Sequence, residues 1–230
     1  MSPQRVKAPR RDHSEQIRLV KRIVAAPAPL YLPRSMLNDR SSTLSLLETR
    51  RSVKPRELVG PGPTQEELER ILTIGARVPD HGKLHPWRFI TVGEDQRDAL
   101  GALLRQALLE HDPSASSAHH QKEDEFAHYA GQLVVVVSAP VPNHKIPVWE
   151  QELSCGAAGM NLLLAAHALG YVAGWVTGWR TYSERVRQAF CEPGERIAAF
   201  IFIGHAAREP EERPRAQLSD VWKRWQPPQL

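Results

Sequence analysis

Residues 133–137 read Leu-Val-Val-Val-Val, an unbroken apolar run in which four of the five side chains are β-branched. β-Branched residues favour extended backbone, and a run without polar alternation is typical of a strand that is covered on both faces. Residues 148–169 follow as the longest helical stretch, rich in apolar side chains, and Gly170 is placed to end it. We expect this helix to be buried almost all round, against a sheet that carries helices on both faces.

Further strands and helices are expected on either side of this core. Strands are predicted over residues 88–92, 171–177 and 197–203, and helices over residues 94–110 and 183–190. Ser42 or Thr43 can cap an earlier helix, and Thr64 with Glu67 forms a capping box for the next one. Residues 111–122 are polar and are predicted to lack regular structure. Strands that alternate with helices indicate an α/β or α+β sandwich.

The composition is that of a soluble globular protein, with 41% hydrophobic and 24% charged residues in 230. A chain of this length can bury a sizeable core without help. No apolar run approaches the ~20 residues that a membrane span needs. The two cysteines, Cys155 and Cys191, are too few for a disulfide framework and lack metal-ligand spacing. They are typical of a protein from a reducing cytoplasm.

The positive charge is concentrated at the N-terminus. Residues 1–24 contain seven Lys and Arg against two acidic residues, whereas the whole chain has a net charge of +4. We predict that residues 1–40 are a basic, proline-rich and poorly ordered extension, and that residues 41–230 form the folded domain. A basic arm that binds nucleic acid is the alternative, but no aromatic residues alternate with the cations. Met36 is an alternative start of the chain.

Two clusters of cations indicate an anionic ligand. Residues 50–54 read Arg-Arg-Ser-Val-Lys, and adjacent arginines repel each other unless an anion lies between their forked donors. Residues 213–215 read Arg-Pro-Arg, about 160 residues later. The two clusters could converge on one phosphate or form two separate solvated patches. Charge alone leaves both interpretations open.

A loop rich in polar residues precedes the first predicted strand. Its candidate ligand-contacting residues are Arg77, Asp80, His81, Lys83 and His85. His81 and His85 have the spacing of a helical zinc pair, but Gly82 and Pro86 argue against a helix there. Contacts to a polar ligand and an ordinary exposed loop both remain possible. The chain has no nucleophile elbow, P-loop or GxGxxG turn, so hydrolase and Rossmann-type functions lose their main support.

Taken in order, these motifs resemble those of the nitroreductase-like flavoproteins, most closely the short NAD(P)H nitroreductases. They are Arg50-Arg51-Ser52 with Lys54, Arg77-Val78-Pro79-Asp80-His81, His85-Pro86-Trp87, Gly174-Trp175-Val176-Thr177-Gly178 and Arg213-Pro214-Arg215. The resemblance covers roughly residues 41–225. It implies an α+β fold: a three-layer α/β/α sandwich around a mixed central sheet, with a long central helix at a dimer interface.

The resemblance also implies an activity. Members of the family bind FMN at the interface of a homodimer, and both subunits contribute to each site. Hydride passes from NADH or NADPH to flavin N5, and an electron-poor acceptor such as a nitroaromatic compound or a quinone then takes the electrons. No catalytic side chain and no metal is implied. Another reaction on the same fold, such as dehydrogenation, dehalogenation or flavin fragmentation, is the alternative, because a fold does not fix a reaction.

The family's cofactor contacts can be carried over residue by residue. The resemblance assigns the phosphate and the polar edge of the ring to Arg50, Arg51 and Ser52, and the N1 and O2 side to Lys54. It assigns further cofactor contacts to Arg77 and His81, the N5 side of the ring to Trp175, Val176, Thr177 and Gly178, and the phosphate to Arg213 and Arg215. His85 and Val176 depart from residues that relatives often carry. These departures leave the acceptor undecided. The choice between NADH and NADPH also stays open, because no residue can be named that would recognise the 2′-phosphate of NADPH.

Overall fold

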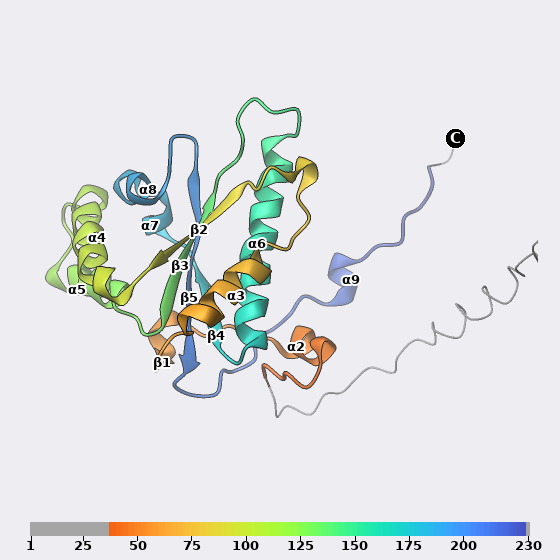
Figure 1. Ribbon diagram of the computed structural model, residues 1–230, viewed down its shortest axis with the longest axis horizontal. Coiled ribbons are helices and arrows are strands. Elements are labelled where there is room, and N and C mark those ends of the chain that lie inside the picture. The colour runs from red at the N-terminus through yellow and green to blue at the C-terminus, as the bar shows by residue number, and fades with distance from the viewer. Residues whose placement is uncertain (1–36, 229–230) are drawn as a thin grey trace, which may run out of the picture. The chain divides into compact units, whose positions relative to one another are not determined.

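This structure, a computed structural model, describes residues 37–228 (Figure 1). The extension expected over residues 1–40 therefore lies almost entirely outside the described residues, and the boundary at residue 40 stays a prediction. Along the described residues the chain forms α2 (Thr43–Thr49), β1 (Leu58–Val59), α3 (Gln65–Gly75), β2 (Trp87–Val92), α4 (Arg97–His111), α5 (Ser117–Ala127), β3 (Gln132–Ser138), α6 (Val148–Ala168), β4 (Val172–Val176), α7 (Trp179–Tyr182), α8 (Glu184–Phe190), β5 (Arg196–Ala206) and α9 (Leu218–Val221).

The sheet is built around β5. Strand β3 pairs with β5, and β2 pairs with β3. Strand β4 and the short β1 also pair with β5. Every pairing among the described strands is antiparallel, which differs from the mixed sheet that the resemblance implied. The reason is that β3 and β4 run parallel to each other but are not neighbours. Strand β5 lies between them in the opposite direction.

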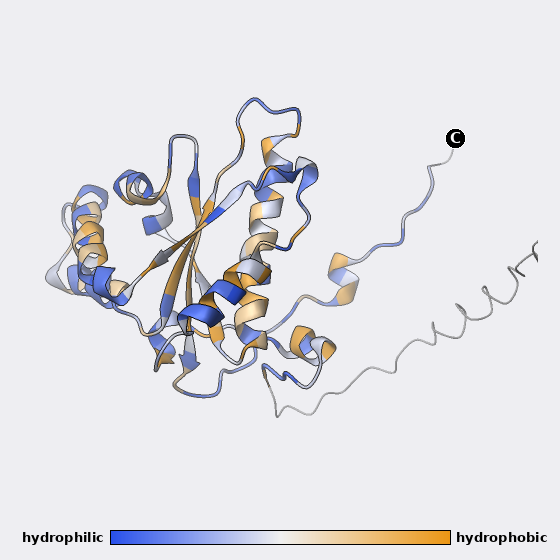
Figure 2. Cartoon of the chain, in the orientation of Figure 1, coloured by the Kyte–Doolittle hydropathy of each residue, from blue (hydrophilic) through white to orange (hydrophobic). Residues whose placement is uncertain are grey.

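Helices cover both faces of this sheet, so the predicted three-layer α+β sandwich is confirmed (Figure 1). Side chains of β3 alternate between the two layers. Val134 and Val136 pack in the core that α3 and α6 complete. Leu133, Val135 and Val137 pack in the core beneath α4, α5 and α8. The apolar colour of the central strands in Figure 2 matches this double coverage, and all five side chains of the run are fully buried.

The long helix α6 is confirmed, and Gly170 follows its end at a φ of +100°. Its expected burial almost all round is wrong for the described chain. The sheet and α3 cover one side, where Leu162 is fully buried. The other side leaves Trp149, Leu153 and Met160 exposed, at 67%, 56% and 38%. These three lie on one face of the helix, because they are four and seven residues apart.

Both predicted helix starts are confirmed. The Ser42 side chain accepts the backbone N–H of Ser45 at the start of α2, and Thr64 with Glu67 forms a complete capping box for α3. The prediction for residues 111–122 is wrong, because α5 begins at Ser117. This helix is polar over most of its surface and buries few apolar side chains, so its sequence carries little helical periodicity. None of the described helices is long and apolar enough to cross a membrane.

Candidate functional site

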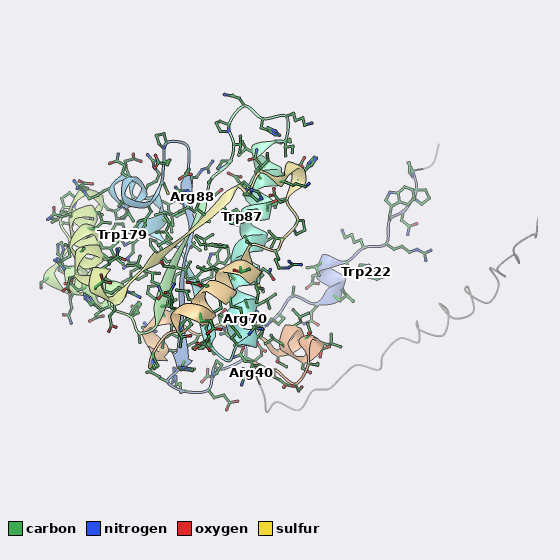
Figure 3. The ribbon with its side chains drawn as sticks, in the orientation of Figure 1. Arg40, Arg70, Trp87, Arg88, Trp179 and Trp222 are labelled. Carbon is green, nitrogen blue, oxygen red and sulfur yellow. The ribbon has the colours of Figure 1, made fainter. Side chains whose placement is uncertain are left out.

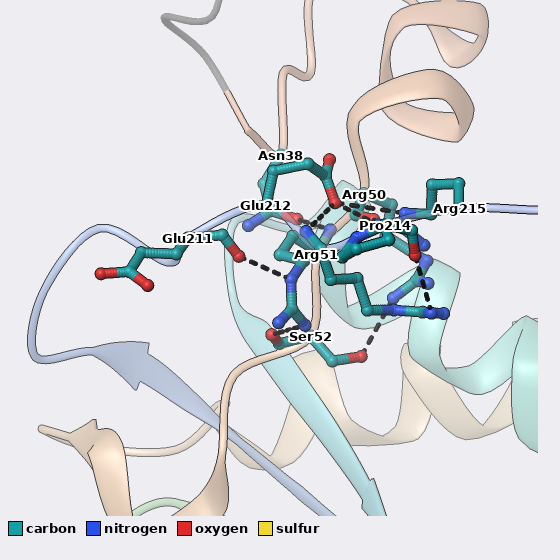
Figure 4. A network of polar contacts seen from close by, with 9 residues as sticks. Asn38, Arg50, Arg51, Ser52, Glu211, Glu212, Pro214 and Arg215 are labelled. Atoms are coloured by element: carbon teal, nitrogen blue, oxygen red, sulfur yellow. Dashed lines mark hydrogen bonds and ion pairs between the residues drawn. The ribbon is translucent and has the colours of Figure 1, made fainter.

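The two cation clusters of the sequence converge in the structure (Figure 4). Nε of Arg51 donates to the backbone carbonyl of Glu211 at 2.8 Å, and Nη2 of Arg215 donates to the carbonyl of Arg50 at 3.3 Å. The two clusters are therefore one group, here named the arginine cluster: Arg50, Arg51, Arg213 and Arg215. Of the two arrangements left open by charge alone, the structure has the convergent one.

The arginine cluster carries an excess of positive charge. Burial lowers the pKa of Arg50, and the charges of Arg215, Arg213 and Arg51 lower it further. Among the described residues, Glu212 is the carboxylate that bonds to the cluster, accepting from Nε and Nη2 of Arg215 at 3.1 and 2.9 Å. Burial opposes ionisation of Glu212, but hydrogen bonds from Arg213 and Arg215 outweigh it and lower the pKa. One carboxylate against four guanidinium groups leaves room for a multiply charged anion.

Local hydrogen bonds fix the first two arginines. The Arg51 backbone N–H donates to Oδ1 of Asn38 at 2.8 Å, and Arg51 Nη1 donates to the Ser52 carbonyl at 2.8 Å. Nη1 of Arg50 donates to the Ser52 hydroxyl at 3.0 Å. Ser52 therefore accepts hydrogen bonds from both guanidinium groups, through its hydroxyl and its carbonyl oxygen. These bonds hold the two arginine side chains close together in the segment that follows α2.

A cleft of about 280 Å³, here named the β4 cleft, lies beside the arginine cluster. Its lining residues are Arg51–Pro55 with Glu57, Gly174–Val176 of β4, and Arg208–Glu211 after β5. Gly174 permits this arrangement, because a Cβ there would collide with the backbone carbonyl oxygen of Val53. Lys54 is exposed at the cleft, and Trp175 keeps 37% of its surface exposed. Arg51 belongs to both the cleft and the arginine cluster.

Thr177 and Gly178 continue from β4 without lining the β4 cleft. Gly178 has a φ of +125°, a conformation that suits glycine. The Thr181 hydroxyl donates to the Gly178 carbonyl at 2.7 Å. Arg180 makes a two-pronged pair with buried Glu123 of α5, at 2.5 and 2.6 Å. Its guanidinium carbon lies 5.4 Å from the ring centre of Trp179, the residue labelled in Figure 3. These contacts anchor the turn that follows β4.

Arg77 and His81 lie elsewhere on the described chain. The Arg77 carbonyl accepts from the side chain of Asn161 in α6, and Nδ1 of His81 lies 2.7 Å from Oε2 of Glu150 in the first turn of α6. Neither residue lines the β4 cleft of its own chain. The described residues contain no group of three or more His, Cys, Asp and Glu side chains suited to a metal.

The sequence interpretation missed three kinds of residue at this site. The first is Glu212, the carboxylate that pairs with the arginine cluster. The second is Arg208, which pairs with Glu57 at 3.2 Å on the wall of the β4 cleft. The third is Gly174, whose lack of a side chain lets the segment around Val53 pack against β4. An isolated glycine inside a predicted strand is a known signal of close backbone approach. The acidic residues gave no comparable signal, because carboxylates are common in exposed loops.

A buried histidine lies behind the cluster. His167, in the last turn of α6, is 1% exposed, and both of its ring nitrogens lack a hydrogen-bond partner among the described residues. Burial, and secondarily the charge of Arg50, lowers the pKa of His167 to about 4. The imidazole is therefore neutral at pH 7 and adds no charge to the arginine cluster.

Comparison with known proteins identifies the family. Residues 47–205 match the Nitroreductase family. The chain belongs to this family. A protein of Haemophilus influenzae named "Putative NAD(P)H nitroreductase" is 38% identical over 174 residues, which are 75% of this chain and 92% of that protein. The matched range includes residues 50–54 and β4, but it ends before Arg213 and Arg215.

Solved structures of nitroreductases have the same fold. The nitroreductase-like family protein from Bacillus cereus superposes with a TM-score of 0.69 at 21% identity, covering 80% of this chain and 95% of that chain. A variant of the FMN and NADPH-dependent nitroreductase NfnB, from sphigopyxis sp. strain HMH, superposes with a TM-score of 0.61 at 20% identity. That match covers 80% of this chain and 99% of the other. At these identities the likeness establishes the fold.

Proposed function

We propose that this nitroreductase-family enzyme is an FMN-dependent oxidoreductase that uses NADH or NADPH to reduce an electron-poor acceptor, such as a nitroaromatic compound or a quinone. Membership in the family makes it an oxidoreductase. The observation that carries the finer proposal is the convergence of Arg50 and Arg51 with Arg213 and Arg215 beside the β4 cleft. The name of the NfnB relative, which includes FMN and NADPH, supports the choice of cofactor and donor.

The residues fit the phosphate end of FMN. A phosphate group carries nearly two negative charges and three acceptor oxygens, and guanidinium groups match it with paired donors. The arginine cluster offers such paired donors, and Glu212 is the single carboxylate bonded to it among the described residues. Burial, and then repulsion from the other arginines, lowers the pKa of Arg50, and a bound anion would relieve that repulsion.

The β4 cleft would hold the ring end of the cofactor. Lys54 would lie near the pyrimidine edge, where a cation stabilises negative charge. Trp175 and Val176 would form the wall on the other side of the ring, with Thr177 and Gly178 beyond them. Bound FMN supplies the hydride and electron transfer itself. The side chains of this enzyme therefore need to bind, orient and exclude water, and they need not provide a nucleophile.

We also propose that the enzyme is a homodimer with the site at the interface. The β4 cleft, at about 280 Å³, is small for a whole cofactor, since ligand sites usually span roughly 300–1,000 Å³. Arg77 and His81 lie outside it, and an interface between two copies would bring them to the site of the partner. The exposed apolar face of α6, with Trp149, Leu153 and Met160, offers a surface for the second copy. Both cysteines are free, in keeping with a cytoplasmic location.

Purification and reconstitution test the proposal. The protein is expected to bind about one FMN per chain, with flavin absorption that bleaches on addition of NADH or NADPH under anaerobic conditions and returns with a nitroaromatic compound or a quinone. A colourless protein that resists reconstitution with FMN would contradict the proposal. Bound flavin that neither nucleotide reduces would favour another reaction on the same fold.

A further inference from the structure

A second cavity lies apart from the proposed cofactor site. It has a volume of about 570 Å³, larger than the β4 cleft, and is here named the Arg97 cavity. It is lined by the turn before α3 (residues 60–64), by Glu94 and Arg97 at the start of α4, and by the turn between α5 and β3 (residues 128–132). It shares no lining residue with the β4 cleft. Its volume falls within the roughly 300–1,000 Å³ that is usual for small-molecule sites.

Arg97 brings a buried positive charge to this cavity. The residue is 5% exposed. Its Nη1 donates to the backbone carbonyl of Ala127 at 2.9 Å, and its Nη2 donates to that of Gly131 at 3.0 Å. Its Nε has no hydrogen-bond partner among the described residues. A guanidinium group has five N–H donors, so Arg97 keeps donors for a further partner.

Arg97 differs from the other arginines that lie partly inside the protein. Arg180 pairs with the carboxylate of Glu123 at 2.5 Å. Arg88 pairs in the same way with Glu195. Both are less buried than Arg97, which bonds only to backbone carbonyls among residues 37–228. Carbonyl groups carry partial charges, and a buried charge without a full counter-charge is costly. A bound anion would reduce this cost.

The other charged groups of the cavity leave the charge of Arg97 unneutralised. Burial lowers the pKa of Arg97, and the charge of exposed Glu94 only partly opposes this effect. His128 is already bonded to the Asp98 carboxylate at 3.0 Å and to the Asp124 carbonyl at 2.8 Å. Arg97 is also the first residue of α4, and the start of a helix carries partial positive charge. An anion in the cavity would therefore meet a net positive charge at Arg97.

We propose that the Arg97 cavity binds a small organic anion, whose carboxylate or phosphate pairs with the guanidinium group of Arg97. This site is separate from the arginine cluster and goes beyond the proposed function. Guanidinium groups suit both kinds of oxyanion, because their paired donors match two oxygens. Pro61, Pro63 and Tyr129 offer apolar surface for the carbon part of the ligand. The ring of Tyr129 is held by an edge-on contact with Phe126.

Isothermal titration calorimetry of the full chain, loaded with one equivalent of FMN so that the arginine cluster is occupied, tests the inference. Benzoate and inorganic phosphate are the probes, and the tighter one identifies the head group. Arg97→Met is expected to weaken its binding at least about tenfold, because the variant loses the charge but keeps a long side chain. Glu94→Gln is expected to strengthen binding about threefold, because it removes repulsion at the exposed rim. Asp95→Asn is the matched control: Asp95 is exposed beside Glu94 but does not line the cavity.

The comparison of Glu94→Gln with Asp95→Asn decides the question even if Arg97→Met fails to fold, because both changes are on exposed side chains. Wild type that binds neither probe at about 10 mM would overturn the inference. So would binding that neither Arg97→Met nor Glu94→Gln alters, since the anion would then lie elsewhere. The same comparisons apply to protein without FMN, so the inference and the proposed function are tested separately.

Discussion

Nη2 of Arg215 donates a hydrogen bond to the backbone carbonyl of Arg50, a contact that joins residues 165 positions apart. Because Arg51 is likewise bonded to the carbonyl of Glu211, the segment after β5 is attached to the segment after α2 at two points. The proposed anion site thus needs both ends of the described domain. Loss of the arginines of either segment is expected to weaken binding of the cofactor phosphate, while the sheet stays folded.

Arg215→Ala is expected to weaken FMN binding by roughly ten- to a hundredfold, since a charge-assisted hydrogen bond contributes about 1.5–3 kcal/mol. Fluorescence titration of the apoprotein with FMN measures the change. Arg70→Ala removes a cation from the exposed surface of α3 (Figure 3) and serves as the control, with little expected effect.

Lys54→Ala is expected to weaken FMN retention less, by roughly fivefold, because this lysine is exposed. It should also make the reduction potential of bound flavin more negative, since a cation near the ring stabilises the charge gained on reduction. Dye-equilibrium titration measures that potential. Unchanged FMN affinity in both Lys54→Ala and Arg215→Ala would refute the assigned pocket.

His167 is expected to make stability depend on pH. Its pKa is about 4 in the folded chain and near 6.5 when unfolded, so the unfolded state binds the proton first. The full contribution is present above about pH 6.5, and it is lost progressively as the pH falls toward 4. The expected loss is roughly 3 kcal/mol, from about 1.4 kcal/mol per pKa unit.

Urea unfolding of wild type and His167→Leu between pH 7.5 and pH 4 measures this effect. The other titrating groups are common to both proteins, so the difference between their free energies of unfolding isolates His167. Wild type should lose stability relative to the variant as the pH falls. Parallel profiles would show that the imidazole does not titrate as described.

Gly174→Ala is expected to destabilise the fold by more than about 2 kcal/mol, because the added methyl group meets backbone at Val53 that cannot move aside easily. FMN binding should fall with it, since the displaced segment carries Ser52 and Lys54. Thermal unfolding and FMN titration measure the two effects. Gly156→Ala is the control, because a Cβ at that position would meet nothing within 4 Å.

Leu153→Glu is expected to produce monomers, since it places a charge on the apolar face of α6 that we assign to the second copy. Leu109→Glu is a matched control: Leu109 is 44% exposed on α4, in the opposite helical layer. Sedimentation velocity should give a dimer for wild type and for Leu109→Glu, and a monomer for Leu153→Glu. A wild-type monomer that binds FMN tightly would contradict the shared site.

Local features of this fold were predictable from sequence, and distant ones were not. The run at 133–137 and the capping box at Thr64 and Glu67 depend on residues close in sequence, and both predictions are confirmed. Helix α5 was missed because its polar residues give no clear period, while buried Glu123 is stabilised by Arg180 from another segment. Convergence of the arginines and the fit of Gly174 against Val53 depend on tertiary structure.

Strand β5 has a further consequence for how this protein is made. It is the last strand of the described chain, yet it pairs with β1, β3 and β4. During synthesis, β3 and β4 leave the ribosome before the strand that separates them exists. The nascent chain must therefore keep two apolar strand edges from aggregating until residue 206 has emerged. Ribosomes that stall earlier would release a chain with an open gap in its sheet, a natural target for chaperones and proteases.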